Sequence, residues 1–213
     1  MQKKRALIFD LDGTLVDAYP AIIRSFNYTM RKLGLPGQPD LVIRRAVGEG
    51  DENLLKPFIR KADLKPAVLI YRQHHRKSLK VDSVLFRGVD KMLSRFGSQG
   101  YKLAVASNRP TEFSKIIIRK LGLDKYFDYV LCADKLKQGK PHPEILRRIL
   151  RRFSLQPKQA LYVGDMVIDA QTGKRAGVQT VIVTTGSSSK SQIKREKPYQ
   201  VISRICELSR IIS

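Results

Sequence analysis

The sequence has little of several residue types, and each shortage excludes a class of protein. Its 213 residues include only two cysteines, Cys132 and Cys206, which lie far apart and in no metal-ligand pattern. We therefore expect free thiols in a reducing compartment and a cytoplasmic location. No apolar run approaches the length of about 20 residues that spans a bilayer. No small-residue cleavage site follows the basic N-terminus, so neither a membrane segment nor a signal peptide is predicted.

Acidic residues are also scarce relative to basic ones. The chain has 41 Lys and Arg against 19 Asp and Glu, and its net charge of +22 attracts polyanions. The excess is spread along the chain, since residues 15–82 carry 13 basic and 7 acidic residues and the remainder carries 28 and 12. The densest cluster, "RRILRR" at 147–152, alternates with apolar residues at helical spacing, which predicts a solvated helix face. A nucleic-acid partner is therefore an alternative that the even charge distribution disfavours.

Short runs rich in β-branched and aromatic residues alternate with helical segments along most of the chain. The runs occupy residues 6–10, 102–107, 129–133, 160–165 and 180–185. This alternation predicts an α/β fold with a doubly wound, parallel, Rossmann-like sheet that helices cover on both faces. In such sheets, ligands bind beyond the carboxyl ends of the strands.

A long stretch between the first two runs has no strand pattern. Residues 15–82 place apolar side chains at helical spacing and are too numerous for a simple loop. We predict an inserted α-helical cap domain over 15–82, able to close over the strand ends, and a catalytic core formed by 1–14 and 83–213. The stretch "GSSSKS" at 186–191 is predicted to be a flexible connection.

Polar residues follow the predicted strands at the same end. Asp10 ends the first run, Ser107 the second and Asp165 the fourth, while Lys140 lies in the loop after the third. Because the carboxyl ends of parallel strands meet at one edge of a sheet, these four groups are expected to converge. Asp12 follows Asp10 closely, and carboxylates beside a buried strand require compensation by a cation. Mg²⁺ suits a site made only of oxygen ligands.

Four ordered motifs resemble those of the haloacid dehalogenase superfamily of phosphatases. They are "FDLDGTL", "ASN", "KPHPE" and "GDMVIDAQTGKRAG", spanning residues 9–177. The insertion resembles the helical cap of the phosphoglycolate phosphatase and phosphoglucomutase branch, and "VGEG", "ASNRP" and the tail "KPYQVISRICELSRII" are most similar to phosphoglycolate phosphatases. The resemblance implies a Mg²⁺-dependent phosphatase that hydrolyses a small phosphorylated metabolite through an aspartyl phosphate.

The resemblance also implies roles for the aspartates. Asp10 is expected to be the nucleophile, and Asp12 to protonate the leaving alcohol and later accept a proton from the attacking water. In the family, one oxygen of Asp10, the main-chain carbonyl at Asp12 and the carboxylate of Asp165 bind the metal ion. Asp169, one helical turn further on, either adds a ligand or holds one through a hydrogen bond.

The remaining motif residues are expected to bind the phosphoryl group and the substrate. Ser107 offers a hydroxyl to the phosphoryl oxygens, and Lys140 a positive charge that also reduces repulsion among the aspartates. Asn108 and Arg109 border Ser107, and either is a candidate for a substrate contact. The turn at residues 48–50 reaches the substrate or simply breaks a helix.

Other polar residues have simpler interpretations. Asp17, Asp82 and Asp90 are expected to be turn or helix-capping residues. His74 and His75 are expected on a solvated helix face, because no third residue has metal-ligand spacing to them.

Two alternatives to a metabolite phosphatase stay open. One is a sugar phosphomutase of the same superfamily, and the other is a phosphatase or binder acting on nucleic-acid ends. Dehalogenation is disfavoured, because the dehalogenases of the superfamily lack an aspartate at the position of Asp12. The sequence leaves the physiological substrate and the oligomeric state undetermined.

Overall fold

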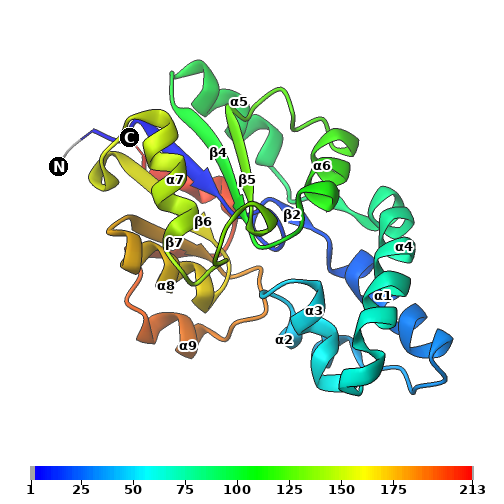
Figure 1. Cartoon of the computed structure of the whole chain (residues 1–213). Helices are drawn as coiled ribbons and strands as arrows, with labels where there is room; N and C mark the ends of the chain where they lie inside the picture. The colour runs from blue at the N-terminus through cyan, green and yellow to red at the C-terminus, as the bar shows by residue number, and fades with distance from the viewer. Residues whose placement is uncertain (1–2, 213) are drawn as a thin grey trace.

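The computed structural model describes residues 3–212 and is built around a six-stranded parallel sheet. The strand order is β5-β4-β1-β6-β7-β8 (Figure 1). The strands are β1 (Ala6–Phe9), β4 (Lys102–Ser107), β5 (Tyr129–Cys132), β6 (Ala160–Gly164), β7 (Gln179–Val183) and β8 (Gln200–Ile202). The predicted doubly wound fold is confirmed, and β8 is an edge strand that the sequence pattern did not reveal.

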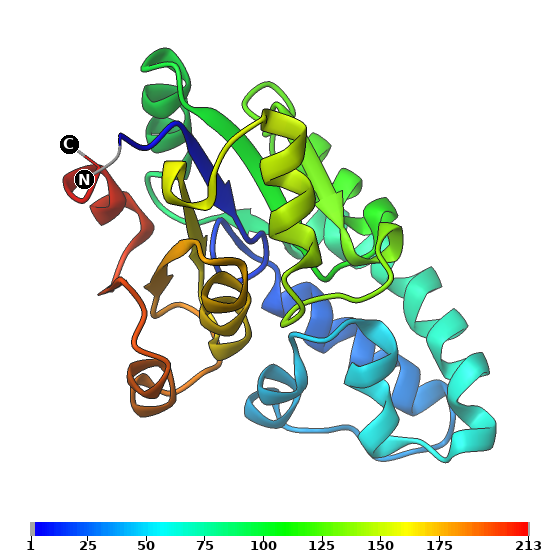
Figure 2. The same ribbon diagram turned by 60° about the vertical axis from the view of Figure 1, so that its left-hand side comes forward.

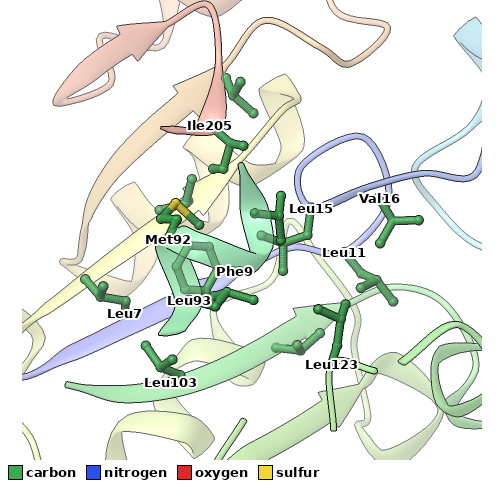
Figure 3. Close-up of a cluster of buried hydrophobic side chains, with 14 of the residues drawn as sticks. Leu7, Phe9, Leu11, Leu15, Val16, Met92, Leu93, Leu103, Leu123 and Ile205 are labelled. Carbon is green, nitrogen blue, oxygen red and sulfur yellow. The ribbon is translucent and has the colours of Figure 1, made fainter. Parts of the chain in front are cut away.

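The alternating side chains of β1 face two separate apolar clusters. Leu7 and Phe9 contribute to the larger cluster (Figure 3). Ala6 and Ile8 contribute to the one on the opposite face. Helices α5 (Val89–Ser98) and α6 (Thr111–Lys120) cover the first face and α7 (Glu144–Phe153) covers the second. Helix α8 (Val167–Ala176) follows β6, and α9 (Lys190–Arg195) follows β7. Burial of both faces explains why β1 reads as an uninterrupted apolar run.

Successive strands of the sheet are added first on one side of β1 and then on the other. The chain adds β4 and β5 on one side of β1 and then returns to add β6 on the other side. Loops that leave β1, β4 and β6 therefore diverge at their carboxyl ends, which opens a crevice there. This is the edge at which the predicted polar residues lie.

The helices between β2 and β3 form a lobe beside the sheet (Figures 1 and 2). We call α1 (Tyr19–Lys32), α2 (Asp40–Ala46), α3 (Asp51–Leu55) and α4 (Leu64–Asp82) the helical lobe. It has its own apolar cluster, which includes Phe26, Ile43 and Tyr71. The short antiparallel pair β2 (Val16–Asp17) and β3 (Val84–Leu85) lies where the lobe joins the sheet. Val16 packs with the apolar cluster of the sheet, so the domain boundary expected at residue 15 stays a prediction. Residues 1, 2 and 213 of the expected core lie outside the described part of the chain.

The arginine-rich helix α7 confirms the prediction of a solvated basic face. Ile145, Leu146 and Ile149 are buried against the sheet, while Arg147 and Arg151 are exposed. Within residues 3–212, no helix has the length and apolar character required to cross a membrane.

Candidate active site

The predicted polar residues meet at the carboxyl edge of the sheet. Asp10 and Asp165 directly follow β1 and β6, Ser107 is the last residue of β4, and all three are buried. The loop between β5 and α7 brings in Lys140, whose Nζ lies 3.0 Å from Oδ2 of Asp10. Asp12, two residues beyond Asp10, lines the same cavity.

Four residues form what we call the lysine cluster: Asp10, Lys140, Tyr162 and Asp169. Oδ1 of Asp169 accepts hydrogen bonds from Lys140 Nζ at 2.7 Å and from the Tyr162 hydroxyl at 2.6 Å. Its Oδ2 accepts from the backbone N–H groups of Asp165 and Met166, both at 3.1 Å. A carboxylate has roughly four acceptor positions, and these contacts occupy them. Asp169 is therefore arranged to hold its neighbours in place.

Three carboxylates crowd together in this cluster and beside it. One oxygen from each of Asp10, Asp165 and Asp169 lies within 4.8 Å of the others, and all three residues are buried. Burial raises the pKa of Asp10 to about 7 despite Lys140, with further contributions from Asp169 and Asp12. Burial and the carboxylates of Asp169 and Asp10 raise the pKa of Asp165 well above its usual value. Burial opposes the charge of Lys140, but Asp10 and Asp169 outweigh it and raise the lysine pKa.

The surroundings of Asp165 fit a hard divalent cation. Thr14 donates a hydrogen bond to Oδ1 of Asp165 at 2.8 Å, whereas Oδ2 has no partner within residues 3–212. A Cβ atom at Gly13 or Gly186 would lie 2.2 or 2.1 Å from this Oδ2, so both positions must lack a side chain. Gly13 also has a φ of +76°, which suits glycine. Carboxylate oxygens are the ligands that Mg²⁺ and similar ions prefer, and this buried Oδ2 is free to bind one.

A second group, the arginine cluster, consists of Asp12, His75 and Arg109. Arg109 donates from Nε to Oδ2 of Asp12 at 2.6 Å and from Nη2 to Oδ1 at 2.7 Å. Its Nη1 lies 2.7 Å from Nε2 of His75 on α4. Arg109 thereby joins the sheet to the helical lobe. Burial opposes the charge of Arg109, but Asp12 outweighs it and raises the arginine pKa.

The prediction that His75 lies on a solvated helix face is wrong. Its side chain is 0% exposed, stacks on Tyr71 and meets the edge of Phe113. Helix α4 packs against α1 on one side and α6 on another, so it has two buried faces. Burial and the charge of Arg109 lower the pKa of His75 well below its usual value. His74 is half-buried and stacks on Tyr28.

Asn108 ties three segments together. Its Nδ2 donates to the carbonyls of Gly48 at 2.9 Å and Lys140 at 3.0 Å, and its Oδ1 accepts from the Lys140 N–H at 2.8 Å. The turn that contains Gly48 and Gly50 does reach the cavity. Asn108 also lines the cavity, and its contact with substrate stays a prediction.

The cavity between sheet and lobe is small, about 60 Å³. Its polar side is formed by Asp10, Asp12, Ser107, Asn108, Arg109 and Lys140, with Asp51 contributed by the lobe. Tyr19, Ile22, Leu54 and Tyr71 form the facing wall. The arrangement provides a nucleophilic carboxylate, two cationic side chains and a cation site around a space that fits a small organic group.

Several contributors were not recognised from the sequence. Tyr162 is an aromatic residue within the otherwise aliphatic strand β6, and Thr14 directly follows the "DLDG" turn. The stretch 186–191, expected to be only a connection, places Gly186 against Asp165, and Ser188 accepts a hydrogen bond from the Val167 N–H. Asp17 is a turn residue as expected, since its Oδ1 accepts from the N–H of Tyr19 at 3.1 Å.

Comparison with known proteins agrees with this fold. The model of the haloacid dehalogenase-like hydrolase family matches residues 7–183, and the chain therefore belongs to this family. Its fold superimposes with a TM-score of 0.94 on the crystal structure of a predicted phosphoglycolate phosphatase from Haemophilus somnus 129pt, at 28% identity and full coverage of both chains. A haloacid dehalogenase-like hydrolase from Streptococcus pneumoniae gives a TM-score of 0.91 at 26% identity, also covering both chains fully.

Curated relatives narrow the class further. A phosphoglycolate phosphatase from Rhodobacter capsulatus is 36% identical over 85% of this chain and 84% of its own length. The phosphoglycolate phosphatase of Nitrosococcus oceani is 29% identical over 100% of this chain and 98% of its own length. The protein is thus a phosphatase of the haloacid dehalogenase superfamily.

Proposed function

We propose that this protein is a Mg²⁺-dependent phosphatase that hydrolyses 2-phosphoglycolate, or a phosphorylated metabolite of similar size, through an aspartyl-phosphate intermediate. The observation that carries the proposal is the lysine cluster beside the unpartnered Oδ2 of Asp165. The names of the curated relatives suggest the substrate. A cytoplasmic location belongs to the proposal and is supported by the two cysteines, which are free thiols.

The residues are placed for a two-step reaction. Asp10 attacks phosphorus, the bond from phosphorus to the leaving oxygen breaks, and Asp12 gives that oxygen a proton. Water then attacks phosphorus and gives its proton to Asp12, which frees phosphate and regenerates Asp10. Ser107 and Lys140 bind the phosphoryl oxygens. Arg109 engages both oxygens of Asp12 in this structure, so one of these contacts has to open for Asp12 to act.

The metal ion would be held by Asp10, the main-chain carbonyl of Asp12 and Asp165. When bound, it neutralises charge between the nucleophile and the phosphate group. Asp169 supports this set by holding Lys140 and the backbone of Asp165. Its occupied acceptor positions favour this supporting role over direct ligation.

The curated relatives favour a phosphatase over a sugar phosphomutase, because they are phosphoglycolate phosphatases. Activation by a sugar bisphosphate would instead support the mutase.

A panel of phosphorylated metabolites assayed with Mg²⁺ tests the proposal. We expect phosphoglycolate to be hydrolysed best, and we expect chelation to stop turnover. Asp10→Asn should lower kcat on the order of 10⁴-fold or more while the circular dichroism spectrum stays unchanged. Turnover that survives chelation or this substitution would overturn the proposal.

A further inference from the structure

We infer that Arg109 binds a carboxylate on the leaving group of the substrate, and that His75 is the positioning residue that holds Arg109 for this contact. The inference rests on the proposed phosphatase function and narrows it to phosphate monoesters of small hydroxy acids.

The cavity has two cationic side chains, and one of them is fully committed. Among the described residues that line it, only Lys140 and Arg109 are cationic. Lys140 already neutralises Asp10 and Asp169, at 3.0 and 2.7 Å, and faces the position of the phosphoryl group. Asp12 and Asp51 also line the space, so a second negative group on the substrate would be repelled unless it met a cation. Arg109 is the side chain left to receive it.

Arg109 has donors to spare for such a group. A guanidinium carries five N–H donors in one plane. Three of them are used within residues 3–212, two by Asp12 and one by His75. One N–H on each of Nη1 and Nη2 is left, so the guanidinium can still donate to a carboxylate on the substrate.

The hydrogen bonds of His75 fix its orientation toward Arg109. The Ser25 hydroxyl donates its one hydrogen to the carbonyl of Ala21 at 2.8 Å, so its oxygen accepts from Nδ1–H of His75 at 3.1 Å. Nε2 of His75 is then the unprotonated nitrogen, and it accepts the Nη1–H of Arg109 at 2.7 Å. A buried neutral histidine therefore sets the plane of the guanidinium from the side of the helical lobe.

The walls limit what the carboxylate can be attached to. Ile22, Leu54 and Tyr71 surround the space, and its volume is about 60 Å³. Lys140 and Arg109 both line this space, so a compact molecule with a phosphate ester and a carboxylate would present one anionic group to each of them.

A matched pair of substrates tests the role of Arg109. 2-Phosphoglycolate and 2-hydroxyethyl phosphate have similar size, and only the first has a carboxylate. The wild-type protein with Mg²⁺ should prefer phosphoglycolate in kcat/KM on the order of 100-fold. Arg109→Gln should remove most of this preference by raising KM for phosphoglycolate, and Arg109→Lys, which keeps the charge without the planar pair of donors, should remove a smaller part.

Equal losses on both substrates would overturn the inference, because Arg109 would then serve Asp12 alone. A wild-type protein that hydrolyses both esters equally well would also overturn it. Failure of the proposed function looks different, since the wild-type protein would then hydrolyse neither ester, or Asp10→Asn would retain activity. Melting curves of both Arg109 variants establish that each one is folded.

Two substitutions test the positioning role of His75. His75→Leu removes the acceptor for Arg109 and should raise KM for phosphoglycolate about 10-fold, with a smaller change in kcat. His75→Gln offers an amide oxygen as acceptor and should restore most of the lost affinity. The role is overturned if both variants behave alike, or if KM for 2-hydroxyethyl phosphate rises by the same factor.

Discussion

The lysine cluster and the arginine cluster line one cavity but are assembled differently. Every member of the lysine cluster comes from the sheet, the loops at its edge or helix α8. The arginine cluster joins Asp12 and Arg109, at the ends of strands, to His75 on the helical lobe. A shift of the lobe would therefore alter the second cluster and leave the first unchanged. The difference suggests that the sheet supplies the phosphate chemistry and that the junction with the lobe selects the leaving group.

Removing the lysine should give the largest effect and should not discriminate between substrates. Lys140→Met leaves Asp10 and Asp169 without their buried counter-charge. We expect kcat to fall about 1,000-fold for phosphoglycolate and 2-hydroxyethyl phosphate alike, and stability to fall by about 3 kcal/mol. Steady-state kinetics and urea unfolding measure the two effects. Lys137→Met, at an exposed position of the same loop, is the control, and a substrate-dependent loss in Lys140→Met would break the comparison.

Binding of Mg²⁺ should be detectable as a rise in thermal stability, independently of any activity assay. Millimolar Mg²⁺ should raise the melting temperature of the wild-type protein by several degrees, because it binds only the folded state. Asp165→Asn should abolish this shift. It should not lower the melting temperature of the metal-free protein, since burial beside Asp169 and Asp10 already raises the pKa of Asp165 and favours its neutral form. A Mg²⁺ shift that persists in the variant would place the ion elsewhere.

Tyr162 and His75 are the supporting residues of the two clusters, and their effects should differ in kind. Tyr162→Phe removes the donor to Asp169 at 2.6 Å. We expect kcat to fall about 10-fold for both substrates and stability to fall by about 1 kcal/mol. Tyr129→Phe on β5 is the matched control. A change in substrate preference caused by Tyr162→Phe would show that the two clusters are not separate.

The buried His75 should also make the stability of the protein depend on pH. Because the pKa of His75 is held well below its usual value, the folded protein keeps this ring neutral. The unfolded chain binds a proton there below pH of about 6.5. The unfolded state then holds more protons, so this contribution to stability is lost as pH falls, by up to about 1.4 kcal/mol per pH unit. Urea unfolding of the wild-type protein and His75→Gln should show a difference that changes between about pH 7 and about pH 5, and a constant difference would contradict the assignment.

The polar residues at the carboxyl ends of the strands were largely predictable from the sequence, because their positions follow from the ends of apolar runs. Asp10, Ser107 and Asp165 each end or follow an apolar run, and parallel strands bring such positions to one edge. Tyr162 could not be assigned, since one aromatic residue in a strand has the same pattern whether or not its hydroxyl finds a partner. The strand β8 was missed because three residues at a sheet edge, with Val201 exposed, give too short a pattern.

The arginine cluster was only partly predictable. Arg109 was a candidate by its position beside Ser107, but its partner His75 lies 34 residues away on a helix of the lobe. Helical periodicity indicates one buried face, and α4 has two, because it packs against both α1 and α6. How a lobe docks on a sheet depends on many contacts distant in sequence, and no local pattern encodes it.

The central claim is that Asp10 is a nucleophile whose phosphorylated form is stabilised by a divalent cation and Lys140. Beryllofluoride mimics a phosphoryl group on a carboxylate, and fluorine NMR detects the adduct without any choice of substrate. We expect bound fluorine signals that require Mg²⁺ and are absent in Asp10→Asn. Signals that persist in this folded variant, or that form equally well in the presence of a chelator, would contradict the claim.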